Sequence, residues 1–340
     1  MKPEPKQVFE KIAATSTGGA PAFEPAPLRP IDEITVALLQ ECIAEQGLEF
    51  GDDRLPSRIH AALTTGKHLL LQGPPGTGKT ELAIAIAKSA AAAGVTRGYA
   101  QIAGSSDWTP ADTIGTYRLT REKNLEFSPG LILEAVRQEK WVVLDELNRA
   151  ATDQAMGPLF TVLSGQSVVL RFEQEDVSGD LLTVAIVPEN ALLGEAYFHY
   201  EIPSSWRIIA TMNTLDVDLL FEISQAFLRR FAVIDIVGPP VEVHAKLLAQ
   251  FETGVAEVDA MVQRLPILPQ APLGPAITKD CARYVLARTK AGGADHRSIA
   301  EELMESFVKP QLAHLSPLDQ QAVHSALAGP PPGAEGPSTA

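Results

Sequence analysis

The stretch HLLLQGPPGTGKTELAIAIAKSA, residues 68–90, decides the fold of this 340-residue chain. It begins with a short run of leucines bounded by turn residues, which predicts a buried strand. The octet GPPGTGKT at 73–80 fits the pattern G-x-x-x-x-G-K-S/T, and an amphipathic helical pattern follows it at once. A strand, a glycine-rich loop and a helix in this order predict a phosphate-binding loop. The alternative is a glycine-rich turn with a surface lysine.

The glycines of this loop allow backbone N–H groups to converge on a polyphosphate, because no Cβ blocks the approach and φ is free to be positive. The start of the next helix adds unpaired amides and the positive end of its dipole. We expect the Lys79 ammonium near the β- and γ-phosphates, and the Thr80 hydroxyl as a ligand of Mg²⁺. The predicted nucleotide-binding residues here are Gly73, Pro74, Pro75, Gly76, Thr77, Gly78, Lys79, Thr80 and Glu81.

The composition favours a soluble globular protein with a sizeable core, since 45% of the residues are hydrophobic. No apolar run approaches the roughly 18 residues of a spanning helix, and the N-terminus lacks the apolar core of a secretory signal, so we expect a cytoplasmic protein without a membrane span. Cys42 and Cys281 lie outside any C-x-x-C motif and are expected to be buried free thiols. The net charge is −14 and no basic stripe is visible, so direct nucleic-acid binding is not expected.

The main domain is predicted at residues 31–240, where short apolar runs alternate with helical patterns. This alternation predicts a five-stranded, mainly parallel sheet covered on both faces. Two β-prone runs, 168–172 and 181–187, predict a long hairpin in an insertion at about 166–205. The expected strands lie at 69–71, 99–104, 141–146, 207–212 and 232–237, and further helices at 31–46, 56–65, 131–138 and 153–163.

Three regions flank this domain. Residues 1–30 are rich in Pro, Ala, Gly and Thr and predict a flexible arm, in which 6–14 form either a short helix or more of the disordered arm. Residues 241–328 show helical patterns without strand signals and predict a small all-helical domain, and 329–340 predict a disordered tail. The helices expected in the second domain lie at 243–251, 255–264, 279–289 and 296–312.

The run VVLDELNRA at 142–150 carries an acidic motif at the end of an expected strand. Ligands of open α/β sheets bind at the carboxyl ends of the strands, so Asp145 and Glu146 are expected beside the phosphates. We expect Asp145 to hold Mg²⁺ together with Thr80, and Glu146 to orient and polarise the attacking water. The alternative is an Asp-Glu pair that caps a helix.

Two further motifs place polar residues beside expected strands. RIIATMNT at 207–214 ends a buried strand with Asn213, whose amide can reach the γ-phosphate and the attacking water or can cap the next turn. FLRRF at 227–231 places Arg229 and Arg230 before the last strand. Two such arginines need anionic partners, either the γ-phosphate bound by a neighbouring subunit or a carboxylate of the same chain.

In order, four motifs resemble those of AAA+ ATPases: GPPGTGKT, VVLDELNRA, IIATMNT and AFLRRF. The branch they resemble holds the MoxR chaperones, the McrB restriction GTPase, cobalt-chelatase CobS-like subunits, midasin and dynein, and the resemblance covers about residues 54–312. It implies a P-loop NTPase αβα sandwich with a helical lid, ATP and Mg²⁺ as cofactors with GTP as the alternative nucleotide, and a homo-oligomeric ring, usually a hexamer. By position it implies Lys79 and Thr80 as Walker A, Asp145 and Glu146 as Walker B, Asn213 as sensor 1, Arg229 or Arg230 as an arginine finger acting in trans, and Arg297 of GADHR as sensor 2.

In this branch an insertion after the second strand and the hairpin before sensor 1 face the pore of the ring or a partner, which here implies residues 105–129 and 166–205. Trp108 and Tyr117 in the first insertion either contact a substrate or anchor their own loop. The resemblance favours a mechanochemical chaperone that remodels a partner protein, such as one with a von Willebrand A domain. Two alternatives stay open: a McrB-like, GTP-driven motor subunit of a DNA restriction or defence complex, and a nucleotide-stabilised scaffold without turnover.

Overall fold

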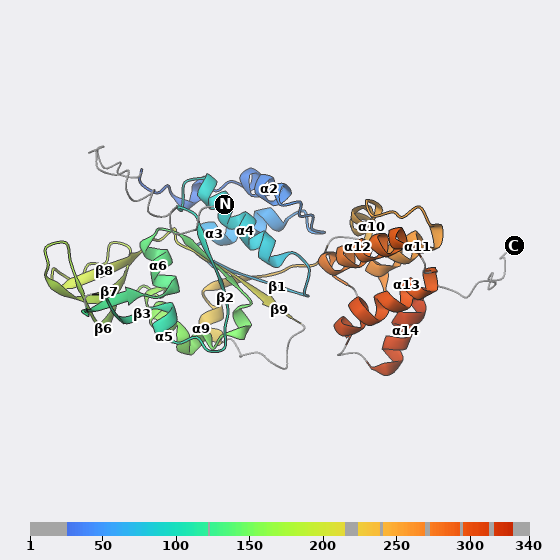
Figure 1. Ribbon diagram of the computed structural model, residues 1–340. Helices are drawn as coiled ribbons and strands as arrows, with labels where there is room; N and C mark the ends of the chain where they lie inside the picture. Colours follow the sequence, from blue (N-terminus) through green and yellow to red (C-terminus); the bar gives the residue numbers. More distant parts are fainter. Residues whose placement is uncertain are drawn as a thin grey trace, which may run out of the picture.

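The computed structural model describes residues 26–121, 123–214, 224–238, 241–268, 273–292, 295–312 and 316–328. These residues form an α/β domain followed by a smaller all-helical domain, and each has its own cluster of buried apolar side chains (Figure 1). Residues 6–14, expected to form either a short helix or part of the disordered arm, and the predicted tail at 329–340 lie outside the described residues. Within the described part of the chain, no helix combines the length and apolar character needed to cross a membrane.

The α/β domain is built on a five-stranded sheet in the order β10-β1-β9-β5-β2, and every neighbouring pair is parallel. The predicted mainly parallel sheet is therefore confirmed. Its central strands are apolar because both faces are covered, and Leu70, Val143 and Ile209 are fully buried. The strands are β1 (His68–Gly73), β2 (Tyr99–Ala103), β5 (Trp141–Asp145), β9 (Ile208–Asn213) and β10 (Phe231–Asp235).

The helix that follows the phosphate loop, α4 (Lys79–Ala92), packs against the centre of this sheet, and α2 lies over it (Figure 1). Small alanines let α4 approach the strands, while Leu82 and Ile86 fill the interface. The helix predicted at 153–163 is split, because Pro158 has no backbone N–H to continue it. The remaining helices of this domain are α2 (Val36–Glu45), α3 (Leu55–Thr64), α5 (Pro110–Thr113), α6 (Leu131–Arg137), α7 (Thr152–Ala155), α8 (Gly157–Val162) and α9 (Gln225–Leu228).

Two small sheets stand beside α6, at the left of Figure 1. In the region of the predicted hairpin, β6 (Val168–Glu175) and β7 (Leu181–Pro188) pair antiparallel, and β8 (Tyr197–Ile202) adds to β7 in parallel. A second hairpin joins β3 (Gly115–Leu119) to β4 (Leu125–Pro129). Neither β8 nor this second hairpin was predicted. β3 and β4 lie inside a polar, turn-rich stretch, and in β8 His199 and Glu201 interrupt the aromatic and apolar residues.

The second domain is helical, and its buried residues form one cluster around α12. A single helix was predicted at 296–312. Its α-helical part ends at Leu303, and residues 304–308 form a π-helical turn followed by a 3-10 turn at 309–312. The last helix, α14, was not predicted, because Val323 and Leu327 are its main buried apolar residues and give a weak pattern. The helices are α10 (Val241–Ala249), α11 (Ala256–Arg264), α12 (Pro275–Ala291), α13 (His296–Leu303) and α14 (Pro317–Ala328).

Candidate functional site

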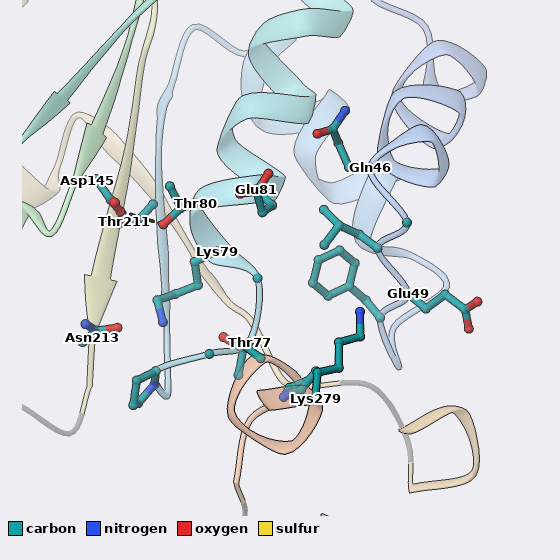
Figure 2. A pocket seen from close by; sticks show the side chains of 18 of the residues that line it. Gln46, Glu49, Thr77, Lys79, Thr80, Glu81, Asp145, Thr211, Asn213 and Lys279 are labelled. Atoms are coloured by element: carbon teal, nitrogen blue, oxygen red, sulfur yellow. Dashed lines mark hydrogen bonds between the residues drawn. The ribbon is translucent and has the colours of Figure 1, made fainter. Parts of the chain in front are cut away.

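A cavity of 590 Å³ lies where the carboxyl ends of the central strands meet the phosphate loop (Figure 2). The parallel register brings the predicted residues together: Asn213 at the end of β9 is the partner of Gly73 at the end of β1, and Asp145 ends β5 on the other side of β9. Residues 75–81 line the cavity together with Asp145, Glu146 and Asn213. The separate motifs of the sequence therefore converge on one space.

The phosphate loop has the backbone that an anion cradle requires. Gly76 and Gly78 have φ values of 75° and 85°, in the left-handed region that favours glycine. Gly78 is also the N-cap of α4, so the free amides of the helix start face the cavity. The loop therefore fits the triphosphate of a nucleotide, because its backbone donors and the dipole of α4 converge on one place.

The side chain of Lys79 is buried and lies over this loop. Its ammonium donates to the carbonyl oxygens of Gly73 and Pro74 at 2.9 and 2.6 Å, and the Thr77 hydroxyl donates to the same Pro74 carbonyl at 2.9 Å. The positive charge is thus held at the mouth of the cradle by neutral acceptors that a phosphate can replace. Gly73 and Pro74 contribute through these carbonyls at the base of the loop.

Asp145 receives two hydroxyl donors on the same oxygen. Thr80 donates to Asp145 Oδ1 at 2.8 Å, and Thr211 donates to it from β9 (Figure 2). A carboxylate and a hydroxyl oxygen in contact are the ligands that Mg²⁺ prefers, so Thr80 and Asp145 fit the predicted metal role. Thr211 was missed, although its position two residues before Asn213 places both side chains on the same face of β9.

Glu146 lies directly after β5 in a left-handed conformation, with φ 52° and ψ 50°. Its backbone N–H donates to Thr211 Oγ1 at 3.0 Å, so the same threonine holds both acidic residues. Its carboxylate forms an ion pair with Arg149, with 2.9 Å between Oε2 and Nε. The amide of Asn148 donates to the Asn213 carbonyl at 3.2 Å, which ties this turn to the end of β9.

The two adjacent arginines lie at the end of α9 and differ in their surroundings. Arg229 is exposed, whereas the guanidinium of Arg230 donates to the Ser164 hydroxyl and lies 5.9 Å from the centre of the Phe160 ring. In the described part of one chain, neither arginine lines the cavity. The prediction that one of them completes a neighbour's site therefore stays a prediction.

The lid contributes α12 to the cavity rather than the predicted residue of α13. Arg297 lies in the first turn of α13, where its side chain is 79% exposed and 3.7 Å from Glu301, and it is not among the described residues that line the cavity. Lys279 of α12, labelled in Figure 2, does line it. Arg283 of the same helix lines it as well. These two residues were missed because the helical pattern of α12 contains no motif that marks a ligand-facing side.

The loop after α2 forms another wall that the sequence did not reveal. Leu48 and Phe50 offer apolar surface beside Gln46 and Glu49. A Cβ placed on Gly78 would lie 3.1 Å from Leu48 Cδ2, which shows how closely this loop approaches the phosphate loop. Apolar surface next to a phosphate cradle suits a nucleotide base. No short motif marked this loop, because its role depends on where the fold places it.

Elsewhere in the described chain, no group of three His, Cys, Asp or Glu side chains is placed to hold a metal ion. One buried polar pair lies at the start of β1, away from the cavity lining. Burial, followed by the nearby guanidinium of Arg207, lowers the pKa of His68 to about 3, and burial lowers the pKa of Arg207 to about 10. The neutral His68 ring accepts a hydrogen bond from the Ile208 backbone at 3.0 Å, so we assign it a role in stability.

Part of the chain is similar to known proteins. Residues 68–231 match the family described as AAA domain (dynein-related subfamily). Midasin from Dictyostelium discoideum is 34% identical over 98 residues, which are 28% of this chain and 2% of that protein, so the chain spans a very small part of this curated relative. A solved structure from Cytophaga hutchinsonii, provisionally described as an ATPase, aligns over 86% of both chains at 16% identity with a TM-score of 0.39.

Proposed function

The chain belongs, through residues 68–231, to the dynein-related branch of the AAA+ ATPases, and from this premise we propose that it couples ATP hydrolysis to the remodelling or activation of a partner protein. The observation that carries the hydrolytic part is the contact of Thr80 with Asp145 at 2.8 Å. It joins the phosphate loop to the strand that presents Glu146. One cavity thus holds the groups needed to bind a triphosphate and to polarise water beside it.

Hydrolysis follows from the placement of these side chains. The cradle of residues 75–80, which includes Lys79, would bind the phosphates, and Thr80 with Asp145 would hold Mg²⁺. Bound there, the metal would supply positive charge that offsets the charge of the phosphates. Glu146 acts as the general base: it orients the attacking water and accepts a hydrogen bond from it. The Asn213 amide, at the same edge of the sheet, fixes the position of the water and the γ-phosphate.

We assign the trans-acting arginine to Arg229 and expect it to act, in a ring of six subunits, on the nucleotide of the next subunit. Arg229 is exposed at the end of α9, while Arg230 is engaged inside its own chain by Ser164 and Phe160. A long side chain that is available on the surface can reach a neighbour, and arginine suits phosphate through its planar fork of donors. Arg230 then anchors the helix end from which Arg229 projects.

The partner-facing surface is assigned to the two small sheets. Tyr117 anchors the β3–β4 hairpin, because its hydroxyl accepts from the Glu173 backbone at 2.8 Å and its ring packs edge-on against Phe172. This supports the anchoring role for Tyr117 rather than substrate contact. Leu119 and Leu125 lie opposite each other on the same hairpin and are each 67% exposed. This apolar pair is suited to contact a protein partner.

The test is turnover of ATP and of GTP by the purified chain with Mg²⁺, with and without double-stranded DNA, over a range of protein concentrations. The proposal expects ATP turnover that rises with assembly and does not respond to DNA. Stimulation by DNA together with preference for GTP would replace it by the McrB-like alternative. If the assembled chain shows no turnover, the proposal is wrong and the alternative of a nucleotide-stabilised scaffold without turnover is favoured. Capture with Glu146→Gln, which should bind nucleotide and stall, identifies the partner.

A further inference from the structure

The ion pair between Glu146 and Arg149 is a feature that the proposed function leaves unused. Arg149 Nε lies 2.9 Å from Glu146 Oε2. Arg149 ends the 3-10 turn Leu147–Arg149, and its backbone N–H donates to the Glu146 carbonyl at 3.0 Å. The turn therefore closes on itself and places the guanidinium beside the carboxylate that is expected to polarise water.

The backbone of Glu146 is fixed from several sides. Its φ of 52° is unusual for a residue with a side chain, and its N–H is held by Thr211 at 3.0 Å. Its carbonyl lies so close to Gly104 that a Cβ there would be 2.4 Å from the Glu146 oxygen. With the backbone fixed, the Glu146 carboxylate can still turn about the bonds of its side chain. Among the described residues, Arg149 forms an ion pair with this carboxylate.

We propose that Arg149 is a positioning residue that acts in its own subunit, through Glu146, to hold the carboxylate in the orientation in which it polarises the attacking water. This inference rests on the proposed hydrolytic function and assigns a further residue to the same site. In the described part of the chain Arg149 is not among the residues that line the cavity, so it reaches the reaction through Glu146. The expected consequence is an effect on kcat and little effect on nucleotide binding.

The size of the effect follows from the role of the base. A positioned general base contributes about 10²- to 10⁴-fold to a rate, and a displacement of about 1 Å can remove about 10²-fold. A carboxylate that loses its fixed partner still spends part of its time in the active orientation. We therefore expect kcat to fall by about tenfold or more, but by less than the full contribution of the base, when Arg149 loses its donors.

The chain offers a closely matched control. Arg137 and Glu134 form another i,i+3 ion pair, 2.6 Å apart, with side chains that are 57% and 31% exposed. The corresponding values for Arg149 and Glu146 are 54% and 32%. In the described chain Arg137 lies outside the nucleotide cavity. Loss of an exposed pair of this kind has little effect on stability. Arg137→Met therefore reports what the loss of such an ion pair does on its own.

The experiment compares wild type, Arg149→Met, Arg149→Lys and Arg137→Met for kcat, KM and the Kd of a fluorescent ATP analogue. We expect Arg149→Met to lower kcat about tenfold or more with KM and Kd within about twofold, Arg149→Lys to restore part of kcat, and Arg137→Met to match wild type. Wild-type turnover is measured first, so its absence would reject the proposed function itself. Normal kcat in Arg149→Met, or a change mainly in KM and Kd, would overturn the positioning role alone.

A mixing experiment decides whether Arg149 acts in its own subunit. Arg149→Met is mixed with an excess of Lys79→Ala, which keeps Arg149 but cannot bind nucleotide. If Arg149 acts through the Glu146 beside it, turnover per Arg149→Met subunit stays low. Recovery would overturn the proposal and assign Arg149 to the neighbouring site. Arg229→Gln, mixed in the same way, is the control expected to recover.

Discussion

Replacement of Thr211 by valine removes a side chain that holds both acidic residues of the site. Thr211 is 2% exposed, donates to Asp145 Oδ1, and accepts from the Glu146 backbone at 3.0 Å. Valine has nearly the same shape and leaves both partners without this contact. We therefore expect lower stability and lower turnover from a change that leaves the phosphate loop intact.

The magnitude follows from the two bonds. A hydrogen bond to a charged acceptor is worth about 1.5–3 kcal/mol, and a buried N–H without its acceptor costs about 1–3 kcal/mol. Asp145 keeps its contact with Thr80, and the added methyl group returns part of the loss, about 1 kcal/mol. The net loss is about 1.5–5 kcal/mol, or about 3–20 °C in the melting temperature of a domain of this size.

The assay is thermal unfolding of wild type, Thr211→Val and Thr211→Ser, followed by kcat and nucleotide affinity with and without Mg²⁺. Serine keeps the hydroxyl and should lie close to wild type. Valine should lower kcat by about tenfold to 10²-fold because Glu146 is displaced, and should weaken binding only when Mg²⁺ is present. If the valine variant has the same melting temperature and the same kcat as the serine variant, this account of how β9 supports the site is refuted.

Three further predictions concern single residues. Glu146→Gln should bind nucleotide normally and lower turnover by about 10²- to 10⁴-fold, and normal hydrolysis would exclude Glu146 as the base. Arg229→Gln should lower turnover of the assembled protein at least about 10²-fold. Arg230→Gln should instead lower the stability of the fold. The opposite pattern would assign the trans-acting role to Arg230. Burial lowers the pKa of His68 to about 3 in the folded chain, from the ordinary histidine value of 6.5. The unfolded chain therefore binds the proton first, and stability should fall by about 1.4 kcal/mol per unit as pH drops through that window. His68→Gln should make this acid dependence shallower in urea titrations, and an unchanged slope would contradict the assignment.

The sequence could predict the sheet because its strands are buried on both faces. Leu69, Leu70 and Leu71 form an unbroken apolar run, and the runs of β5 and β9 are similar. The phosphate loop and Asp145 could be predicted for another reason, since fixed spacing encodes their chemistry and the parallel sheet brings the strand ends to one edge. The outer strand β8 carries His199 and Glu201 between its aromatic residues and gave no such signal.

The rest of the site depends on tertiary placement. Leu48 and Phe50 are ordinary loop residues until the loop after α2 lies against Gly78. Lys279 belongs to a helix whose start was predicted at 279, whereas Pro275 begins it one turn earlier, as proline favours at the first helical position. Such residues carry no local mark of function, because any exposed lysine or apolar loop residue looks the same in sequence.

The contact between the second domain and the phosphate loop explains why residues of α12 line the cavity. A Cβ on Gly274 would lie 2.6 Å from the Pro75 carbonyl, and one on Gly76 would lie 3.5 Å from Gly274 Cα, so the two backbones touch directly. Lys279 and Arg283 follow on the side of α12 that lines the cavity. No side chain separates the two backbones, so the phosphate loop and the start of α12 are in contact through two glycines. A larger residue at Gly274 would therefore push the start of α12 away from the phosphate loop.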